Sequence, residues 1–246
     1  PPPPGWGPGW APPQAGPFRT PTVSTTLGAW LQALMWTSSA LALLSTFGAF
    51  GAINALGDLE ERRIGWDGRS TYDDWIIARD AAGAFVGLFW LAWIAGFVVL
   101  LVWLHKAHTA TQQMWPGKRK WGSGWTVGGW FIPLANMVIP KLVINEIERI
   151  ATAPRVGGRV DEGWRRCGTS ALGWVWWLAL TPGIFVWQIG ATITDAPETT
   201  PSDLRIGYWV QGLALLAIAI GLAAGAVFFR RLTRRFRMDT PGNPWT

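Results

Sequence analysis

Residues 81–104 form an unbroken apolar stretch, AAGAFVGLFWLAWIAGFVVLLVWL, without a charged or strongly polar side chain. A helix rises about 1.5 Å per residue, so this stretch would reach about 36 Å and cross a hydrocarbon core of about 30 Å. Three further stretches, 27–56, 171–194 and 206–229, are also free of charge. The sequence therefore predicts an all-α integral membrane protein with four transmembrane helices.

Composition agrees with this fold class. Only 15% of the residues are charged, compared with about 25% in a typical soluble domain. The chain also has 20 Trp, a residue that favours the interface between membrane and water. We predict a membrane domain over 27–235, followed by a C-terminal tail over 236–246.

Residues 1–26 are dominated by Pro and Gly and carry Arg19 as their only charge. Such a segment cannot bury a core, so we predict a disordered, partly polyproline-II tail. Two interpretations stay open, a flexible leader and a docking peptide for a proline-binding domain.

The charges between the predicted spans give an orientation. Residues 57–80 hold four Arg and seven acidic residues, whereas 105–170 hold ten Lys or Arg and four acidic residues. Residues 195–205 hold three acidic residues and one Arg, and 230–237 hold five Arg. Because loops on the cytoplasmic side carry the excess of Lys and Arg, we predict a multi-pass protein of the cell membrane. Both termini and residues 105–170 would be cytoplasmic.

Residues 125–144, WTVGGWFIPLANMVIPKLVI, resemble a fifth span by hydropathy, but two arguments oppose that interpretation. Repeated Gly and Pro would break the helix, and broken backbone inside a bilayer requires shielding. A fifth crossing would also move the five Arg between residues 149 and 166 to the outer side, against the charge rule. We predict a re-entrant or interfacial element over 125–150 on the cytoplasmic side.

The second half of this element has the pattern of an amphipathic helix that begins at Pro140. We predict that apolar residues share one face and that polar residues lie toward water, as on a helix lying on a membrane surface. The apolar set is Leu142, Ile144, Ile147 and Ile150, and the polar set is Asn145, Glu148 and Arg149.

The same stretch carries a family resemblance. It resembles a signature W-x-x-G-G-W-F-I-P-x-x-N-x-x-x-P-x-x-x-x-x-E, preceded by an aliphatic-Trp-Leu-x-x-Ala pattern that Val102, Trp103, Leu104 and Ala107 match. This signature is typical of an actinobacterial membrane family catalogued as domain of unknown function 4328. The resemblance covers roughly 27–235, and it implies a membrane architecture without an assigned reaction. Ile132 also matches the signature, and the other matching positions are the candidate functional block: Trp125, Gly128, Gly129, Trp130, Phe131, Pro133, Asn136, Pro140 and Glu146.

Two functions from different classes fit this block. The first is a non-enzymatic membrane scaffold or envelope-associated module that uses the block as its functional surface. The second is a lipid-handling protein or small-solute channel in which Asn136 coordinates the ligand beside unwound backbone at Pro133. A third interpretation is that Gly128, Gly129 and Asn136 only permit tight packing. An enzyme stays possible if a partner supplies the catalytic groups, and the sequence predicts no cofactor.

Other candidate sites have simpler explanations. His105 and His108 are spaced to share a helix face, but interfacial solvation explains them better than a metal site, and we predict no metal. Cys167 is the single cysteine. An unmodified bystander is favoured over a palmitoylation site, and a nucleophile would need His105 or His108 as a base. The acidic residues Asp67, Asp73, Asp74 and Asp80 do not fit a calcium-loop spacing.

We predict no binding to nucleic acid, because the excess of Lys and Arg on the cytoplasmic side explains the basic residues. We expect anionic membrane lipids at the cytoplasmic face as partners. A homo-oligomer or a protein partner is also possible, because Gly83/Gly87 and Gly221/Gly225 have the GxxxG spacing that permits close helix packing.

Overall fold

The computed structural model describes residues 23–61, 71–156 and 159–236. Four of its helices are long and apolar enough to cross a membrane, which confirms the predicted fold class. They are α1 (Thr25–Glu60), α2 (Thr71–Met114), α5 (Ala171–Thr194) and α6 (Pro201–Arg235). Residues 1–22, 62–70 and 237–246, and with them most of both predicted tails and Asp67, lie outside the described residues.

The helices are longer than the apolar spans that predicted them. Helix α2 begins ten residues before the span 81–104 and continues ten residues beyond it. Hydropathy marks only the part that fits in lipid, whereas the backbone hydrogen-bond ladder continues into polar sequence.

The start of α6 is fixed locally by a capping box in which Thr200 and Asp203 satisfy each other's backbone N–H groups.

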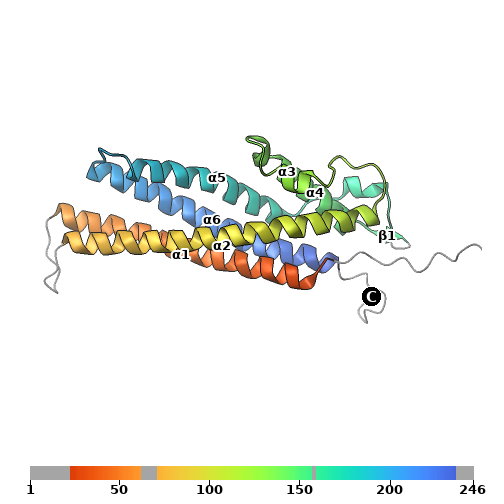
Figure 1. Ribbon diagram of the computed structural model, residues 1–246, viewed down its shortest axis with the longest axis horizontal. Coiled ribbons are helices and arrows are strands. Elements are labelled where there is room, and N and C mark those ends of the chain that lie inside the picture. Colours follow the sequence, from red (N-terminus) through yellow and green to blue (C-terminus); the bar gives the residue numbers. More distant parts are fainter. Residues whose placement is uncertain (1–22, 62–70, 157–158, 237–246) are drawn as a thin grey trace, which may run out of the picture.

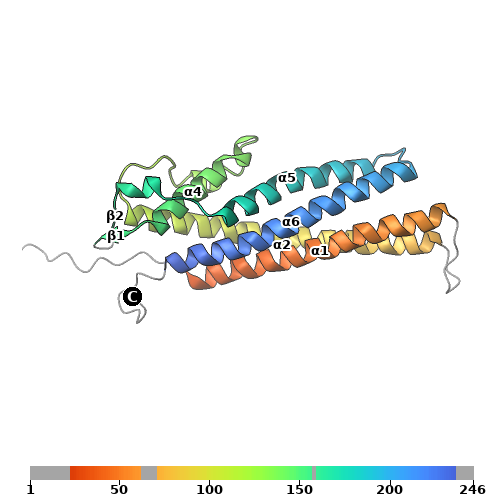
Figure 2. The same ribbon diagram turned by 180° about the vertical axis from the view of Figure 1, so that it is seen from behind.

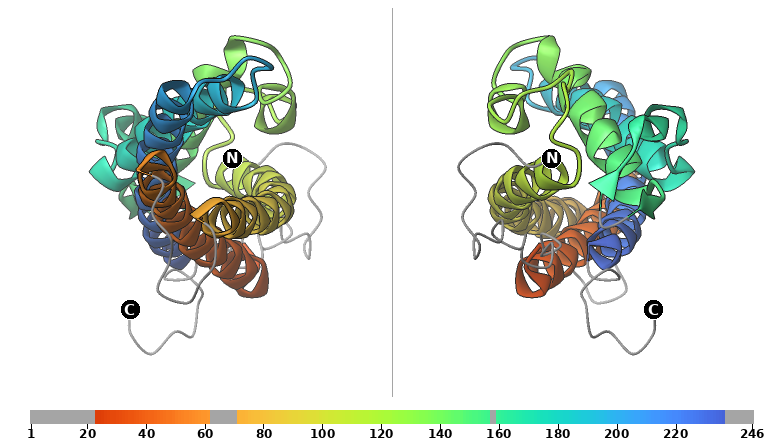
Figure 3. Two further views of the ribbon diagram at one scale, coloured as in Figure 1. Left: turned by 90° about the vertical axis from the view of Figure 1, so that its left-hand side faces the viewer. Right: turned by 90° about the vertical axis from the view of Figure 1, so that its right-hand side faces the viewer.

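The long helices pack in the order α2–α1–α6–α5. Helix α1 packs against both α2 and α6, and α5 packs against α6 (Figures 1 and 2). Viewed along the bundle, the helices form an arc with α2 and α5 at its two ends (Figure 3). The start of α1 and the end of α6 lie at the same end of the bundle (Figure 1).

Aromatic side chains connect the two ends of the arc. The ring of Trp90 on α2 lies 5.4 Å from that of Trp187 on α5. Nearer the other end, Trp130 lies between Phe97 on α2, at 5.2 Å, and Trp177 on α5, at 5.6 Å. The distances are typical of edge-to-face aromatic pairs. Trp130 belongs to the segment between α2 and α5, so this segment helps to close the arc.

We call residues 115–170 the connecting segment. It contains α3 (Trp125–Gly128), a 3-10 turn η1 (Ala135–Met137), α4 (Ile139–Thr152) and a second 3-10 turn η2 (Glu162–Arg166). Between α4 and η2, β1 (Arg155–Val156) pairs antiparallel with β2 (Arg159–Val160). Helices α3 and α4 both contact α2. Within residues 115–156 and 159–170, no helix is long and apolar enough to be a fifth transmembrane helix, as predicted.

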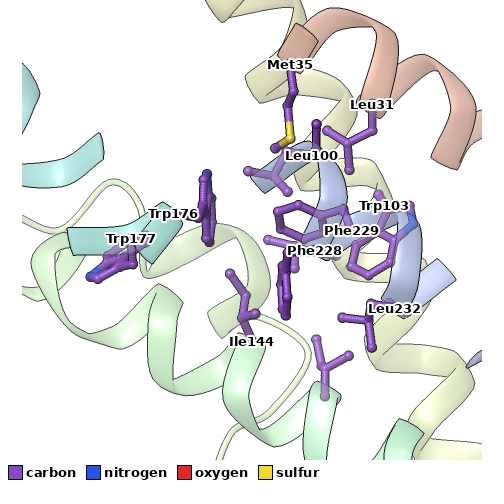
Figure 4. Close-up of a cluster of buried hydrophobic side chains, with 14 of the residues drawn as sticks. Leu31, Met35, Leu100, Trp103, Ile144, Trp176, Trp177, Phe228, Phe229 and Leu232 are labelled. Carbon is purple, nitrogen blue, oxygen red and sulfur yellow. The ribbon is translucent and has the colours of Figure 1, made fainter. Parts of the chain in front are cut away.

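The hydrophobic core includes side chains from both the bundle and the connecting segment. Trp103 is fully buried, its ring lies 5.1 Å from that of Phe229, and its indole N–H donates to Thr233 Oγ1 at 3.1 Å. Trp176 packs against the other side of Phe229, and Ile144 enters the same cluster from α4 (Figure 4). The core of the bundle and that of the connecting segment are therefore continuous.

The two GxxxG pairs differ in their surroundings. A Cβ atom added at Gly225 would lie 2.4 Å from Trp176 Cδ1, so Gly221/Gly225 serve packing of α6 against α5 within the chain. A Cβ at Gly83 or Gly87 would have no neighbour within 4 Å among the described residues. Homodimerisation through that second pair stays a prediction.

We predict that Gly225→Ala destabilises the bundle while Gly87→Ala does not. Both changes improve helix propensity by about 1 kcal/mol, but only the first forces a methyl group against a buried ring, at a cost of about 1–3 kcal/mol. Thermal unfolding in detergent measures the difference. Equal unfolding temperatures for the two variants would contradict the packing of Trp176 on α6.

Candidate functional site

The chain turns sharply after α3, within the candidate block. A Cβ at Gly129 would lie 3.0 Å from both Ile139 Cγ2 and the Trp125 carbonyl oxygen, so a larger residue would be crowded there. Gly128 has open space instead. Leu134 has a φ of 63°, which L-amino acids adopt at a cost. The backbone at 129–134 therefore forms a constrained turn rather than a helix.

The apolar side chains of this turn point outward. Leu134 is 81% exposed and Phe131 is 67% exposed. Their neighbours Ile132, Met137 and Val138 are exposed as well. An exposed apolar cluster at a strained turn is costly in water but suits contact with lipid. We call Phe131–Val138 the apolar turn; its exposure agrees with the predicted re-entrant or interfacial element.

Two contacts hold the apolar turn against the bundle. Trp130 inserts its ring between α2 and α5, as described above. Trp177 on α5 donates its indole N–H to the Met137 carbonyl oxygen at 3.1 Å. Because both contacts use side chains of the spanning helices, the turn is fixed relative to the bundle.

Glu146 organises the other side of the connecting segment. Its Oε1 accepts hydrogen bonds from Arg119 Nε and from the Lys120 backbone N–H, each at 3.3 Å. Its Oε2 accepts from the Trp121 backbone N–H, also at 3.3 Å. The Arg119 and Glu146 side chains are both only 6% exposed. One carboxylate thus ties residues 119–121 to α4.

Arg119 extends this network to α2. Its Nη1 donates to the His108 carbonyl oxygen at 3.2 Å and to Thr111 Oγ1 at 2.9 Å. The His108 Nε2 lies 3.1 Å from the Trp121 carbonyl oxygen. His108 is therefore buried and serves structure rather than the exposed interfacial role that we predicted; exposed His105 lies outside this network.

Helix α4 differs from the predicted surface helix. Ile144, Ile147 and Ile150 are fully buried, as expected for the apolar face. Asn145 and Glu148 are only 6% and 5% exposed, so the prediction that they face water was wrong. The physical reason is that residues on the far side of α4 are covered by other parts of the connecting segment. Leu142, assigned to the apolar face, instead lines a polar cavity with Asn145 and Arg149.

Glu148 connects α4 to α5. Its Oε1 accepts from the backbone N–H of Ser170 at 2.8 Å, and Ser170 is the N-cap residue of α5. Burial raises the pKa of this carboxyl, and the hydrogen bond from Ser170 opposes that rise. Glu148 thereby fixes α4 against the first turn of a spanning helix.

Lys141 is the charged residue that interrupts the apolar block, and it is 2% exposed. Its Nζ lies 4.8 Å from the centre of the Trp174 ring and 5.6 Å from that of Phe228. No hydrogen bond to this Nζ occurs among the described residues. Burial lowers the pKa of Lys141 to about 8, although the neighbouring Glu148 carboxylate opposes the shift. Lys141 and Glu148 are seven residues apart, so they lie on the same face of α4. This spacing could have predicted from the sequence that the two charges lie near each other.

A basic cavity of about 470 Å³ lies between α4, η2 and residues 118–121. Five cationic side chains and one carboxylate, the paired Glu146, line it together with two indole rings, one amide and Leu142. The lining residues are Lys118, Arg119, Lys120, Trp121, Leu142, Asn145, Glu146, Arg149, Trp164 and Arg165. Sequence reasoning identified Glu146 and the basic excess of residues 105–170 but not this grouping, which depends on long-range contacts.

The candidate block thus divides into two groups with different roles. Trp125, Phe131 and Pro133 are exposed, whereas Trp130 is half-buried and Pro140 and Glu146 are buried. Pro140 lies in the first turn of α4, where a missing N–H costs nothing. The block does not form one cluster of side chains around a ligand.

Asn136 does not have the surroundings of a ligand-coordinating residue. It is half-exposed and lines none of the cavities described here. The cavity nearest to the block, behind Trp130, is apolar and about 30 Å³, room for only a few water molecules. This geometry gives the channel hypothesis no support.

The remaining candidates stay apart from both groups. Cys167 is half-buried, with its Sγ 4.0 Å from the Gly163 carbonyl oxygen. No group of three or more potential metal ligands occurs within residues 23–61, 71–156 and 159–236. Asp73, Asp74 and Asp80 lie in the first turns of α2 rather than in a loop.

Together, the four helices that are long and apolar enough to cross a membrane define a helical membrane protein. The chain belongs to the family described as Domain of unknown function (DUF4328), whose match covers residues 67–234. The match omits all of α1, although the predicted resemblance covered residues 27–235. The actinobacterial origin and the signature positions stay predictions. Comparison with curated proteins and with solved structures found no match.

We predict that Glu146→Gln destabilises the connecting segment by about 3–5 kcal/mol, because it leaves the buried Arg119 guanidinium without a counter-charge. Limited digestion with trypsin at residues 118–120 and thermal unfolding in detergent measure this loss. The matched control is Glu162→Gln, at an exposed position. The prediction fails if both variants resist trypsin like the unmodified protein.

Lys141 predicts a pH dependence. Its pKa is about 8 in the folded protein and 10.5 ordinarily, so between these pH values the unfolded chain binds more protons. Stability then rises with pH across this window. We expect Lys141→Met to remove that rise, as seen in unfolding temperatures between pH 8 and 10.5, whereas Lys106→Met, at an exposed position, keeps it. Identical pH profiles for all three proteins would contradict the burial of this ammonium group.

Proposed function

We propose that this chain is a non-enzymatic protein of the cell membrane, in which the connecting segment forms a platform that binds the lipid surface. Both termini and the platform would lie on the cytoplasmic side. The observation that carries this proposal is the apolar turn, which exposes Phe131, Leu134 and Val138 on the same connecting segment that lines the basic cavity. Lipid is therefore the ligand class that we assign to the platform, in line with the lipid-handling hypothesis.

The fixed position of the apolar turn supports contact with the membrane. Trp130 and the hydrogen bond from Trp177 hold the turn against α2 and α5. A turn fixed beside spanning helices is held at one depth in the bilayer. Its exposed apolar side chains then enter the acyl region while the backbone stays near the interface, as in amphipathic membrane elements.

Charge supports the orientation. Acidic residues dominate 195–205, at the end of the bundle where α5 meets α6, and basic residues dominate the connecting segment at the other end. An excess of Lys and Arg is retained on the cytoplasmic side of membranes. Anionic lipids are concentrated in that leaflet and attract basic surfaces. A scaffold for a partner protein would present the same platform, and contact with lipid would fix the position of the platform relative to the membrane surface.

A depth measurement tests the proposal. In a Cys167→Ser background, Leu134→Cys carries an environment-sensitive fluorophore, and lipids brominated at defined acyl positions quench it. We expect strong quenching at residue 134, because the side chain lies in the acyl region.

The matched control is Glu162→Cys, at an exposed position on η2, where we expect no quenching. Membrane-impermeant maleimide added to intact cells should label Glu198→Cys and leave Glu162→Cys unlabelled. Absence of quenching at residue 134 would overturn the lipid contact, and labelling of Glu162→Cys from outside would overturn the orientation.

A further inference from the structure

The basic cavity described above is lined by residues with buried polar atoms that have no hydrogen-bond partner among the described residues. The positive charge expected on the cytoplasmic side of a membrane protein does not explain these atoms. An exposed Lys or Arg beside a membrane is solvated by water and needs no ligand. Arg119 differs, because its side chain is 6% exposed and its Nη2 is buried without a hydrogen-bond partner among the described residues. A buried guanidinium nitrogen without an acceptor is costly, so an acceptor from outside the chain would remove that cost.

Two more groups in the cavity have the same deficit. The Nε of Arg149 and the Oδ1 of Asn145 are buried, and neither has a hydrogen-bond partner within the described part of the chain. Both residues line the cavity on the same face of α4 as Glu146. Three residues of the cavity wall thus each have one polar atom without a partner within the described part of the chain: two guanidinium donors and one amide acceptor.

The geometry points to a binding site for a phosphate group that carries a hydroxylated substituent, such as a glycerol phosphate. Arg119 and Arg149 supply charge-assisted hydrogen bonds to the phosphate oxygens, for which guanidinium geometry is well suited. A hydroxyl of the substituent donates to the Asn145 amide oxygen. Arg165 and Lys118 reach the same space from the exposed rim of the cavity.

The rest of the lining fits such a ligand. Glu146 does not repel the phosphate strongly, because its carboxylate is paired with the Arg119 guanidinium and accepts hydrogen bonds from the backbone N–H groups of residues 120 and 121. The indole rings of Trp121 and Trp164 form apolar walls suited to the carbon atoms of a polyol. The volume of about 470 Å³ is within the range of small-molecule sites.

Two sources supply this chemistry, an anionic lipid headgroup and a soluble polyol phosphate. The inference rests on the proposed function, because a lipid source requires the platform to lie at the membrane surface. The experiment uses the full chain in nanodiscs. One arm adds glycerol 1-phosphate or inorganic phosphate to discs of phosphatidylcholine alone and follows tryptophan fluorescence and heat of binding. The other arm includes phosphatidylglycerol and counts the lipids retained after gentle detergent extraction by native mass spectrometry.

The variants are Arg149→Gln and Arg165→Gln, with Arg166→Gln as the matched control on η2. Arg166 is exposed and does not line the cavity, but its replacement changes the net charge equally. We expect saturable binding in at least one arm, weakened about tenfold or more by each cavity variant and unchanged by the control. Binding of the soluble phosphate identifies a soluble ligand, and retention of phosphatidylglycerol alone identifies a lipid headgroup.

Two results would overturn the site. One is the absence of saturable binding in both arms by folded protein. The other is an equal effect of all three variants that salt screens away, which identifies general surface attraction. The depth measurement at residue 134 is independent of phosphate binding. If Leu134 lies deep in the bilayer but no phosphate binds, only the inferred phosphate site is contradicted. If Leu134 lies outside the acyl region, the proposed function is contradicted. Binding of soluble glycerol phosphate would then still support the phosphate site.

Discussion

The connecting segment depends on one buried carboxylate, that of Glu146. It neutralises Arg119 and accepts two backbone N–H groups, while Arg119 reaches two acceptors at the end of α2. Buried ion pairs of this kind contribute little net stability compared with apolar packing, yet they are costly to break. The pair therefore fixes the position of residues 115–121 relative to α4. The same residues, together with α4 and η2, form the walls of the basic cavity.

Helix α4 connects this polar network to the membrane domain. Glu148 fixes the start of α5, Ile144 enters the core beside Phe228 and Phe229, and Lys141 lies over aromatic rings from α5 and α6. The short helix thus has contacts with α2, α5 and α6 although it crosses no membrane. Movement of α4 would disturb the basic cavity and the packing at the end of the bundle together.

The apolar turn and the basic cavity are complementary parts of one platform. The turn offers an apolar surface held by Trp130 and Trp177, and the cavity offers cationic donors held by Glu146 and Arg119. An amphipathic lipid has the same two components, an acyl region and a charged headgroup. This correspondence unites the proposed function with the inferred phosphate site, while each part has its own experimental test.

The four spans and the rejection of a fifth followed from the sequence, because apolar length and helix-breaking residues are local properties. Pro140 likewise predicted the start of α4. The environments of Asn145, Glu148 and Lys141 could not be predicted in this way. Their burial depends on residues of other elements, such as Ser170, which lies 22 positions from Glu148. Periodicity on one helix cannot show what covers its polar face. The exclusion of segment 125–144 as a span followed from the sequence alone. Only the tertiary structure decided that Glu146 would bind Arg119 and that Arg149 and Arg165 would line the same cavity, because these contacts join residues far apart in the chain.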